Sequence, residues 1–388
     1  MSFDPVTLTA EETTAQGLAN GAAGVALLHI ERALTGSEGW GSAHARIRQV
    51  AAGPVDAAAH TGLYYGAPAV NFVLHAASAG GHPSYRAAAE ILDGHVLRLT
   101  RRRLAAAMNR TRCGQTTSFG EYDLFYGLTG IGALLLRRAS GSDSLADVLG
   151  YVVRLVEPRH DDGCELPGWW VDHDPDRILP TPGGHANLGM AHGAAGLLAL
   201  LALARRRGCV VDGHDRAIER LSAWFDRWRQ DSEDGPWWPY WVTREELRTG
   251  RPTQRGPGRP SWCYGAIGIG RAQQLAAIAT GDSSRRTAAE ETLAASLADR
   301  QLHRIGDAGL CHGMAGVYQS AYRAARDARS PAIEQRLPAV AAALIRYAAA
   351  QNGEAGLLTG DAGVNLALET TRYTTPPPSE WDACLLIT

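Results

Sequence analysis

A short motif, Gly-x-x-Gly followed at once by an apolar, alanine-rich run, recurs along this chain and constrains its fold more than any other feature. Six copies are intact, and the copy at residues 66–69 ends in Ala69 instead of glycine. The seven copies begin at Gly21, Gly66, Gly127, Gly193, Gly265, Gly313 and Gly360. Because each following run is apolar nearly all round, we expect a buried helix after each motif. Regular recurrence of one unit predicts a repeat architecture.

Amphipathic segments fill the intervals between the motifs. Examples are residues 85–104, 215–228, 284–297 and 331–350, where apolar residues recur every three or four positions between charged ones. One amphipathic helix for each buried helix predicts an all-α fold, an α/α toroid with seven inner and seven outer helices. Glycines before the inner helices would allow close backbone approach where the helix N-termini crowd together. We expect residues 1–388 to form this single domain.

Two longer insertions interrupt the repeats, at residues 161–187 and 231–260. Both are rich in Gly, Pro and Trp and cannot be continuous helix. Residues 236–243 (PWWPYWVT) favour a short strand or hairpin. Their tryptophans support two interpretations equally, binding of a ligand beside a central cavity or simple capping of the toroid. We expect both insertions at the rim of that cavity, facing a substrate.

Potential metal ligands occupy equivalent positions of the repeats. Cys263 and Cys311 each lie two residues before a first glycine, and His192 and His312 each lie one residue before. Equivalent positions share one rim in a closed ring, so these side chains should converge. Cys263, Cys311 and His312 would suit one zinc ion with an open coordination position. Two thiolates exclude magnesium and calcium, and three ligands do not make an iron–sulfur site. The alternative is a closed structural zinc site with His192 as the fourth ligand.

Two charged residues precede inner helices at similar places. Asp123 lies four residues before its glycine, and Arg259 lies four residues before Cys263. Taken alone, each reads as a solvated charge or a helix cap. Their place at the entrance to inner helices favours a position lining the cavity.

Charge and cysteine usage exclude several classes of function. The formal net charge is -2, which gives no sign of a nucleic-acid-binding surface. The longest strongly apolar run, residues 197–204, is too short to span a bilayer. The N-terminus carries no secretion signal, and the six cysteines are scattered. A cytoplasmic location is therefore expected, with any membrane association made through partner proteins.

Five motifs together resemble those of the lanthionine cyclase (LanC-like) family. They are YDLFYGLTG at 122–130, NLGMAHGAAG at 187–196, RPSWCYG at 259–265, LCHGMAG at 310–316 and WDACLL at 381–386. The resemblance covers essentially the full chain and implies a seven-plus-seven α toroid, with Cys263, Cys311 and His312 as zinc ligands. It also implies Asp123, His192, Arg259 and Tyr264 as active-site residues. Since the first repeat begins so early, the chain resembles the stand-alone cyclases of class I lanthipeptide pathways.

That resemblance implies a reaction and its partners. A cysteine of a dehydrated precursor peptide, consisting of leader and core, would add to a dehydroalanine or dehydrobutyrine of the same peptide. A free thiol, with a pKa of about 8.5, is mostly protonated at neutral pH, and zinc coordination deprotonates it. His192 would be the general acid, oriented by Asp123. Arg259 would hold Asp123 or the enolate oxygen, and Tyr264 would donate a further hydrogen bond. A dehydratase and a transporter of the same pathway would be partners.

Three alternatives stay open at the level of sequence. A LanC-like enzyme could add glutathione to dehydroamino acids instead of closing rings in a peptide. A non-catalytic scaffold could bind the precursor within a synthetase complex. A protein prenyltransferase would use an Asp-Cys-His zinc site, but the repeat positions hold no concentrated basic pocket for a diphosphate.

Overall fold

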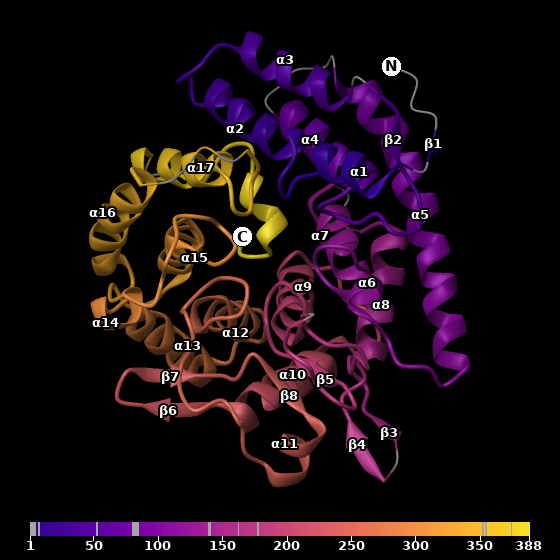
Figure 1. Cartoon of the computed structure of the whole chain (residues 1–388), viewed down its shortest axis with the longest axis vertical. Helices are drawn as coiled ribbons and strands as arrows, with labels where there is room; N and C mark the ends of the chain where they lie inside the picture. The colour runs from indigo at the N-terminus through magenta and orange to yellow at the C-terminus, as the bar shows by residue number, and fades with distance from the viewer. Residues whose placement is uncertain are drawn as a thin grey trace.

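The seven motifs each begin an α-helix, and these helices form the inner ring of the computed structural model (Figure 1). The structure describes residues 5–6, 8–51, 53–79, 85–138, 141–161, 163–176, 178–350, 353, 355–373 and 375–388. The inner helices are α2 (Ala22–Leu34), α4 (Ala67–Ala79), α7 (Leu128–Arg138), α9 (Ala194–Arg206), α12 (Ala266–Thr280), α15 (Met314–Asp327) and α17 (Asp361–Arg372). Each contacts the next along the chain, and α17 contacts α2, which closes the ring.

A second set of helices lies outside the first. It consists of α3 (Trp40–Val50), α5 (Arg86–Arg112), α8 (Asp143–Val156), α10 (His214–Trp228), α13 (Ser283–Ser296) and α16 (Leu337–Ala348). Each packs on the inner helix that precedes it in sequence, and the short α1 (Ala10–Gln16) contacts α2. Shorter helices are α6 (Phe119–Tyr122), α11 (Arg244–Thr249), α14 (Asp299–Leu302) and η2 (Glu334–Arg336). The toroidal all-α class predicted from the repeats is confirmed.

A closed belt of backbone hydrogen bonds joins the seven motif loops. In each loop the residue two before the first glycine accepts, through its carbonyl oxygen, an N–H group of the neighbouring loop. The donors are Leu18, Tyr64, Leu124, Met190, Cys263, Cys311 and Leu358, and the acceptors are Tyr64, Phe125, Ala191, Cys263, Cys311, Leu358 and Ala19, in that order, at 2.8–3.3 Å. The belt holds all seven loops at one end of the ring. We call the next residue of each loop, Asn20, Tyr65, Tyr126, His192, Tyr264, His312 and Thr359, the rim.

The second glycine of the motif is required by close packing of the loop on the first turn of the helix. A Cβ atom at Gly268 would lie 2.0 Å from the carbonyl oxygen of Trp262, and one at Gly316 would lie 1.9 Å from that of Leu310. Both distances are far below van der Waals contact, so no side chain fits there. In these two copies the second glycine is therefore a steric requirement of the loop, whereas the copy at residues 66–69 accommodates Ala69.

The two insertions contain the expected short strands. β3 (Arg159–Asp161) and β4 (Cys164–Leu166) form one hairpin, and β6 (Gln230–Ser232) and β7 (Gly235–Trp237) form another. β5 (His185–Asn187) pairs antiparallel with β8 (Trp241–Thr243), which ties the two insertions together. β1 (Pro5–Val6) pairs with β2 (Val55–Asp56) near the N-terminus. Trp169 and Trp170 are buried in the first insertion, which agrees with capping, whereas Trp237 and Trp238 of the second insertion are buried beside a small pocket.

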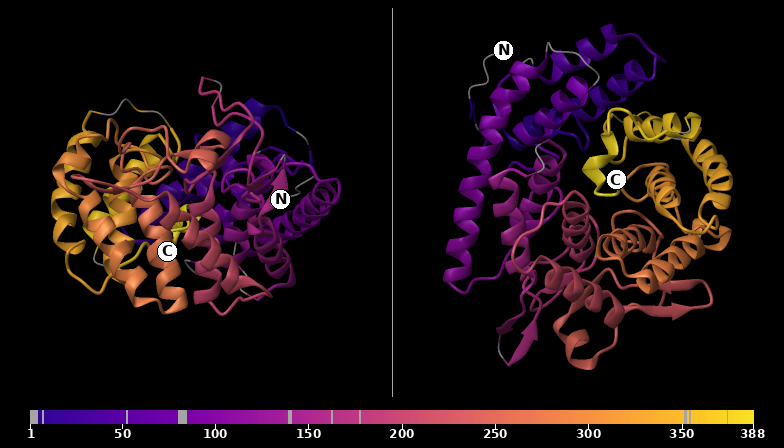
Figure 2. Two further views of the ribbon diagram at one scale, coloured as in Figure 1. Left: turned by 90° about the horizontal axis from the view of Figure 1, so that it is seen from below. Right: turned by 180° about the vertical axis from the view of Figure 1, so that it is seen from behind.

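The middle of the ring is occupied by the C-terminal segment, where the sequence predicted a cavity (Figures 1 and 2). This segment includes η3 (Trp381–Leu385). Trp262 donates its indole N–H to the carbonyl of Leu385 at 3.0 Å. Asp382, fully buried, accepts two hydrogen bonds from the guanidinium of Arg323 at 2.6 and 2.7 Å. The rim residues consequently line one end of a filled ring rather than a central hole.

In the part of the chain that is described, no helix combines the length and the apolar character that crossing a membrane requires.

Candidate metal centre and adjacent acid–base pair

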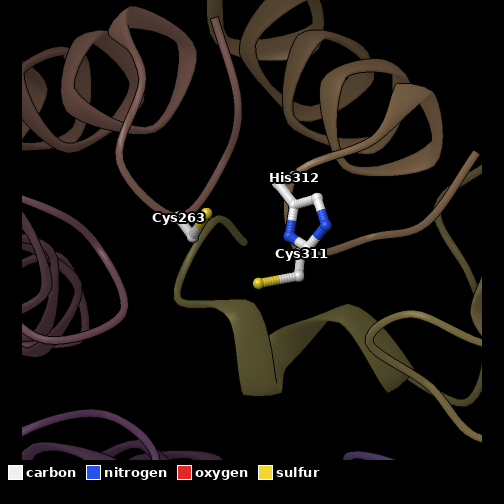
Figure 3. A group of neighbouring side chains, drawn as sticks. All are labelled: Cys263, Cys311 and His312. Atoms are coloured by element: carbon white, nitrogen blue, oxygen red, sulfur yellow. The ribbon is translucent and has the colours of Figure 1, made fainter. Parts of the chain in front are cut away.

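Cys263, Cys311 and His312 come together on two neighbouring motif loops (Figure 3). Cys263 lies before α12, and the other two residues lie before α15. The two sulfur atoms and a ring nitrogen of His312 all lie within 4.8 Å of one another. The N–H of Cys263 donates to the carbonyl of Cys311 at 3.1 Å, so the main chain sets the separation of the two loops.

This donor set fits a zinc ion. Zinc binds sulfur at about 2.3 Å and imidazole nitrogen at about 2.0–2.1 Å, which puts the ligand atoms of a tetrahedral site roughly 3.3–3.8 Å apart. The three ligand atoms, all within 4.8 Å of one another, already lie near those separations. Three ligands leave one tetrahedral position open. Cys263 is buried, whereas the side chain of His312 exposes 33% of its surface, so the group is reachable from the rim.

The three side chains shift one another's pKa values through their mutual contacts. Hydrogen bonds from Cys311, and then from His312, hold the pKa of the Cys263 thiol well below its ordinary value. The same contact with Cys263, together with burial, raises the pKa of Cys311. The hydrogen bond to Cys263 also raises the pKa of His312. Cys263 is thus the more acidic of the two thiols, and binding of a metal ion requires its cysteine ligands to be deprotonated.

His192 and Asp123 form a hydrogen-bonded pair on the rim beside this group. His192 Nδ1–H donates to Oδ2 of the fully buried Asp123 at 2.6 Å. The other carboxylate oxygen accepts the N–H groups of Tyr126 and Gly127 at 2.7 and 2.9 Å. Because Asp123 holds Nδ1, Nε2 is the ring nitrogen left for proton exchange with a bound molecule. The ring of Phe119 stacks on His192 with centroids 4.9 Å apart, which fixes the ring plane.

Tyr264 lies next to His192, with ring centroids 6.2 Å apart. Its hydroxyl accepts a hydrogen bond from the Asn187 side chain at 3.3 Å. Burial raises the pKa of Tyr264, so the phenol stays protonated and can donate. The sequence predicted this neighbourhood for Tyr264 but missed Asn187, although that residue opens the NLGMAHG motif.

Arg259 lies on the side of the rim that carries the candidate metal ligand His312. Its Nη1 is 4.0 Å from Oδ2 of Asp307, and the same carboxylate oxygen is 3.5 Å from Nε2 of His312. Arg259 therefore pairs with Asp307 and not with Asp123, which His192 and two backbone amides already engage. Sequence reasoning missed Asp307. The signal was present, because Arg259 and Asp307 both lie six residues before the first glycine of their repeats.

A small pocket adjoins this site and includes residues of the second insertion. Trp237, Tyr240, Arg259 and Tyr264 are among the residues that line it. The ring of Tyr240 lies edge-on to that of Tyr264 at 5.6 Å. The segment 231–260 thus reaches the candidate site directly.

A closed double ring of helices, with two cysteines and a histidine on adjacent motif loops, defines a helical toroid with a sulfur-rich candidate metal site. The chain belongs to the family of lanthionine synthetase C-like proteins, whose model matches residues 12–386. It is 25% identical over 204 residues to the nisin biosynthesis protein NisC of Lactococcus lactis subsp. lactis. That match spans 51% of this chain and 48%, about half, of the relative. The solved structure of a nisin cyclase has the same fold, with a TM-score of 0.82 and 18% identity over 97% of this chain and 93% of that one.

Proposed function

We propose that this protein is a zinc-dependent lanthipeptide cyclase, which adds peptide cysteine thiols to dehydroalanine or dehydrobutyrine of the same peptide to form thioether rings. The observation that carries the proposal is the presence of a three-residue sulfur-rich group and a His–Asp pair on one rim of a LanC-like toroid. The name of the relative NisC, a nisin biosynthesis protein, agrees with a role in making such peptides.

Cys263, Cys311 and His312 would hold the zinc ion. Held by these residues, zinc would supply one effect, a lower pKa for a thiol that takes up the open coordination position. The two cysteine sulfurs would favour a soft metal ion that accepts a further sulfur ligand.

His192 would manage the protons of the reaction. Addition of S–H across the double bond forms a bond from sulfur to the β-carbon and a bond from hydrogen to the α-carbon, with no change of oxidation state. One proton must therefore leave the thiol and one must arrive at the α-carbon. Nε2 of His192 is suited to both transfers, because Asp123 keeps Nδ1 protonated and stabilises the positive ring.

Arg259 and Tyr264 would stabilise the negative charge that develops on the carbonyl oxygen of the dehydro residue. Arg259 is about half exposed on the metal side of the rim, and Tyr264 is a protonated phenol beside His192. A cation and a neutral donor aimed at a developing enolate act most strongly in a site that excludes water.

The substrate would be a dehydrated precursor peptide with leader and core. The class of reaction that supplies it is the dehydration of serine and threonine, so a dehydratase is an expected partner, with a transporter to remove the product. We propose that residues 1–388 act as one domain in the cytoplasm and that segments 161–187 and 231–260 flank the bound peptide.

The proposal is tested with the purified, zinc-loaded protein and a synthetic peptide that carries one dehydroalanine and one cysteine a few residues apart. Ring closure consumes the free thiol without changing the mass of the peptide, and it should exceed the rate in protein-free and chelator-treated controls. A parallel reaction contains glutathione. A product heavier by one glutathione would favour the glutathione-adding alternative. Tight binding of the peptide without loss of its thiol would favour a scaffold.

A further inference from the structure

The rim has two chemically different halves. In the order set by the backbone belt, His192, Tyr264 and His312 follow one another, and they carry the acid–base and metal-binding groups. The remaining arc holds neutral side chains only. It consists of Thr359, Asn20, Tyr65 and Tyr126, and Tyr126 is next to His192.

Tyr65 and Tyr126 form a flat aromatic pair on the second arc. Their ring centroids are 4.8 Å apart, and the ring planes differ by 6°. Tyr126 exposes 39% of its surface, so part of the pair faces solvent at the end of the ring. Burial, a hydrogen bond with Tyr126, and the nearby Asp123 and Cys311 raise the pKa of Tyr65.

The pair is joined directly to the acid–base residues. The amide of Tyr126 donates to Oδ1 of Asp123 at 2.7 Å, and the opposite carboxylate oxygen holds His192. A molecule reacting at His192 therefore has the aromatic pair as its immediate neighbour along the rim.

A glycine makes this stacking geometrically accessible. Residues 62–65 form a tight turn in which the amides and carbonyls of Gly62 and Tyr65 pair at 2.9 and 3.3 Å. A Cβ atom at Gly62 would lie 2.5 Å from the carbonyl oxygen of Phe125 and 2.6 Å from Cα of Tyr126. Only glycine permits the two loops to approach so closely, and this approach sets Tyr65 against Tyr126.

Resting on the proposed function, we propose that the stacked Tyr65–Tyr126 pair binds an apolar side chain of the peptide substrate, next to the residues that react. The exposed aromatic surface offers apolar contact without charge, and its neighbour His192 fixes where the reacting atoms lie. A peptide bound along the rim would thus place its reacting residues at His192, Tyr264 and His312. One flanking side chain would then lie on the arc of neutral residues that includes Tyr65 and Tyr126. The pair selects apolar over acidic flanking residues.

The test compares two synthetic peptides that differ only in one residue flanking the dehydroalanine, leucine in one and aspartate in the other. The wild-type protein should favour the leucine peptide about tenfold in kcat/KM, mainly through KM. Tyr126→Ala should raise KM for the leucine peptide roughly three- to tenfold and reduce the preference, with kcat little changed. Tyr126→Phe and Tyr65→Phe keep the rings and should retain the preference. Tyr373→Ala, after the far end of α17, is the control for truncation of a tyrosine away from the rim.

A binding measurement separates this inference from the proposed function. In a second pair of peptides serine replaces the cysteine, so no ring can close, and affinity is read from the anisotropy of an attached dye. Weaker binding of the leucine peptide to Tyr126→Ala than to the wild-type protein supports the aromatic site. This holds even if the wild-type protein closes no ring, because failure of ring closure would refute only the cyclase proposal. Equal affinity and an unchanged leucine preference in Tyr126→Ala would overturn the inference while leaving cyclisation intact. If Tyr65→Ala fails to fold, the more exposed Tyr126→Ala decides.

Discussion

Cys263 and Cys311 occupy the same position of consecutive repeats, and a backbone hydrogen bond between them fixes their separation. The main chain would hold this arrangement even if the sulfur atoms were removed. A metal ion at this place is therefore expected to be needed for chemistry and not for folding. Substitution of either cysteine tests both parts of this statement, the need for the metal in catalysis and its dispensability for folding.

Cys263→Ala and Cys311→Ala should each release zinc and abolish ring closure while leaving the helical content unchanged. Removal of one of three ligands leaves too few donors to retain the ion. Metal content is measured by elemental analysis and fold by circular dichroism. Cys209→Ala, outside the group, is the matched control. Loss of helical structure on zinc removal would mean that the site is structural.

His192→Ala should keep the metal and lower the rate of ring closure roughly 10²–10⁴-fold, the usual contribution of a general acid or base. Asp123→Asn should also slow the reaction, because an amide cannot stabilise a positive imidazole ring. Steady-state kinetics and zinc content are measured on the same preparations. A rate equal to that of the wild-type protein would remove His192 from the mechanism.

At the scale of elements, the loop before α15 shows how sequence, packing and site are connected. The second glycine of its motif, Gly316, packs against the carbonyl of Leu310. Leu310 is followed directly by Cys311 and His312. Any side chain at position 316 must push this loop away from the helix. The position of two candidate ligands thus depends on one missing Cβ atom.

Gly316→Ala should lower the free energy of unfolding by about 1–3 kcal/mol and weaken zinc binding in the folded protein. Gly306→Ala is the matched control, because a Cβ atom at Gly306 meets open space. Chemical denaturation gives the stability, and competition with a chelating dye gives the zinc affinity. Wild-type zinc affinity in Gly316→Ala would show that the loop tolerates the displacement.

The repeats made the inner helices predictable, and they made the outer helices predictable in part. Four outer helices lie at the segments named from the sequence, whereas α3 and α8 were not located, and residues 375–388 after α17 form no seventh outer helix. α5 was predicted to end near residue 104 but continues to Arg112, because Ala107 is buried and Arg110 pairs with Glu121 at 2.7 Å. The amphipathic pattern from residue 331 begins with a turn and the short η2, and α16 starts only at Leu337. The local periodicity of apolar residues carries no information about such tertiary contacts, so these helix ends could not be predicted from it.

The candidate site was predictable to the extent that repeat positions determine it. Equivalent positions brought Cys263 and Cys311 together, but they could not distinguish Asp123 from Asp307 as the partner of Arg259. That choice depends on side-chain directions, and both carboxylates lie close to rim residues. The stacking of Tyr65 on Tyr126 could not be predicted for the same reason, because it also depends on side-chain directions.

At the scale of the whole molecule, the C-terminal segment holds the inner helices together from within. Buried charges participate in this contact. Glu31 on α2 accepts hydrogen bonds from the amide and hydroxyl of Ser379, and Asp382 binds Arg323 on α15. Local sequence patterns do not reveal that the last segment enters the ring, because the partners in these contacts are 348 and 59 residues apart in the chain.

Stability should depend on pH through Glu31. Burial raises its pKa from 4.5 to about 6 in the folded protein. The folded state then holds this proton more tightly than the unfolded state, so the free energy of unfolding should fall by about 2 kcal/mol as pH rises from 4.5 through 6. Glu31→Gln cannot ionise and should lack this decrease. Urea denaturation of both proteins between pH 4 and 7 measures it, and parallel stability curves would contradict it.

The belt of loop-to-loop hydrogen bonds also imposes an order on biosynthesis. The amide of Cys311 finds its acceptor on Leu358, and Leu358 in turn donates to Ala19 in the first loop. While a ribosome is still making the last repeat, the emerging chain is an open arc, and its sixth loop has no neighbour on one side. The loop that carries Cys311 and His312 therefore gains its second neighbour only when the last repeat is in place, and a chain that stops before Leu358 would lack this support.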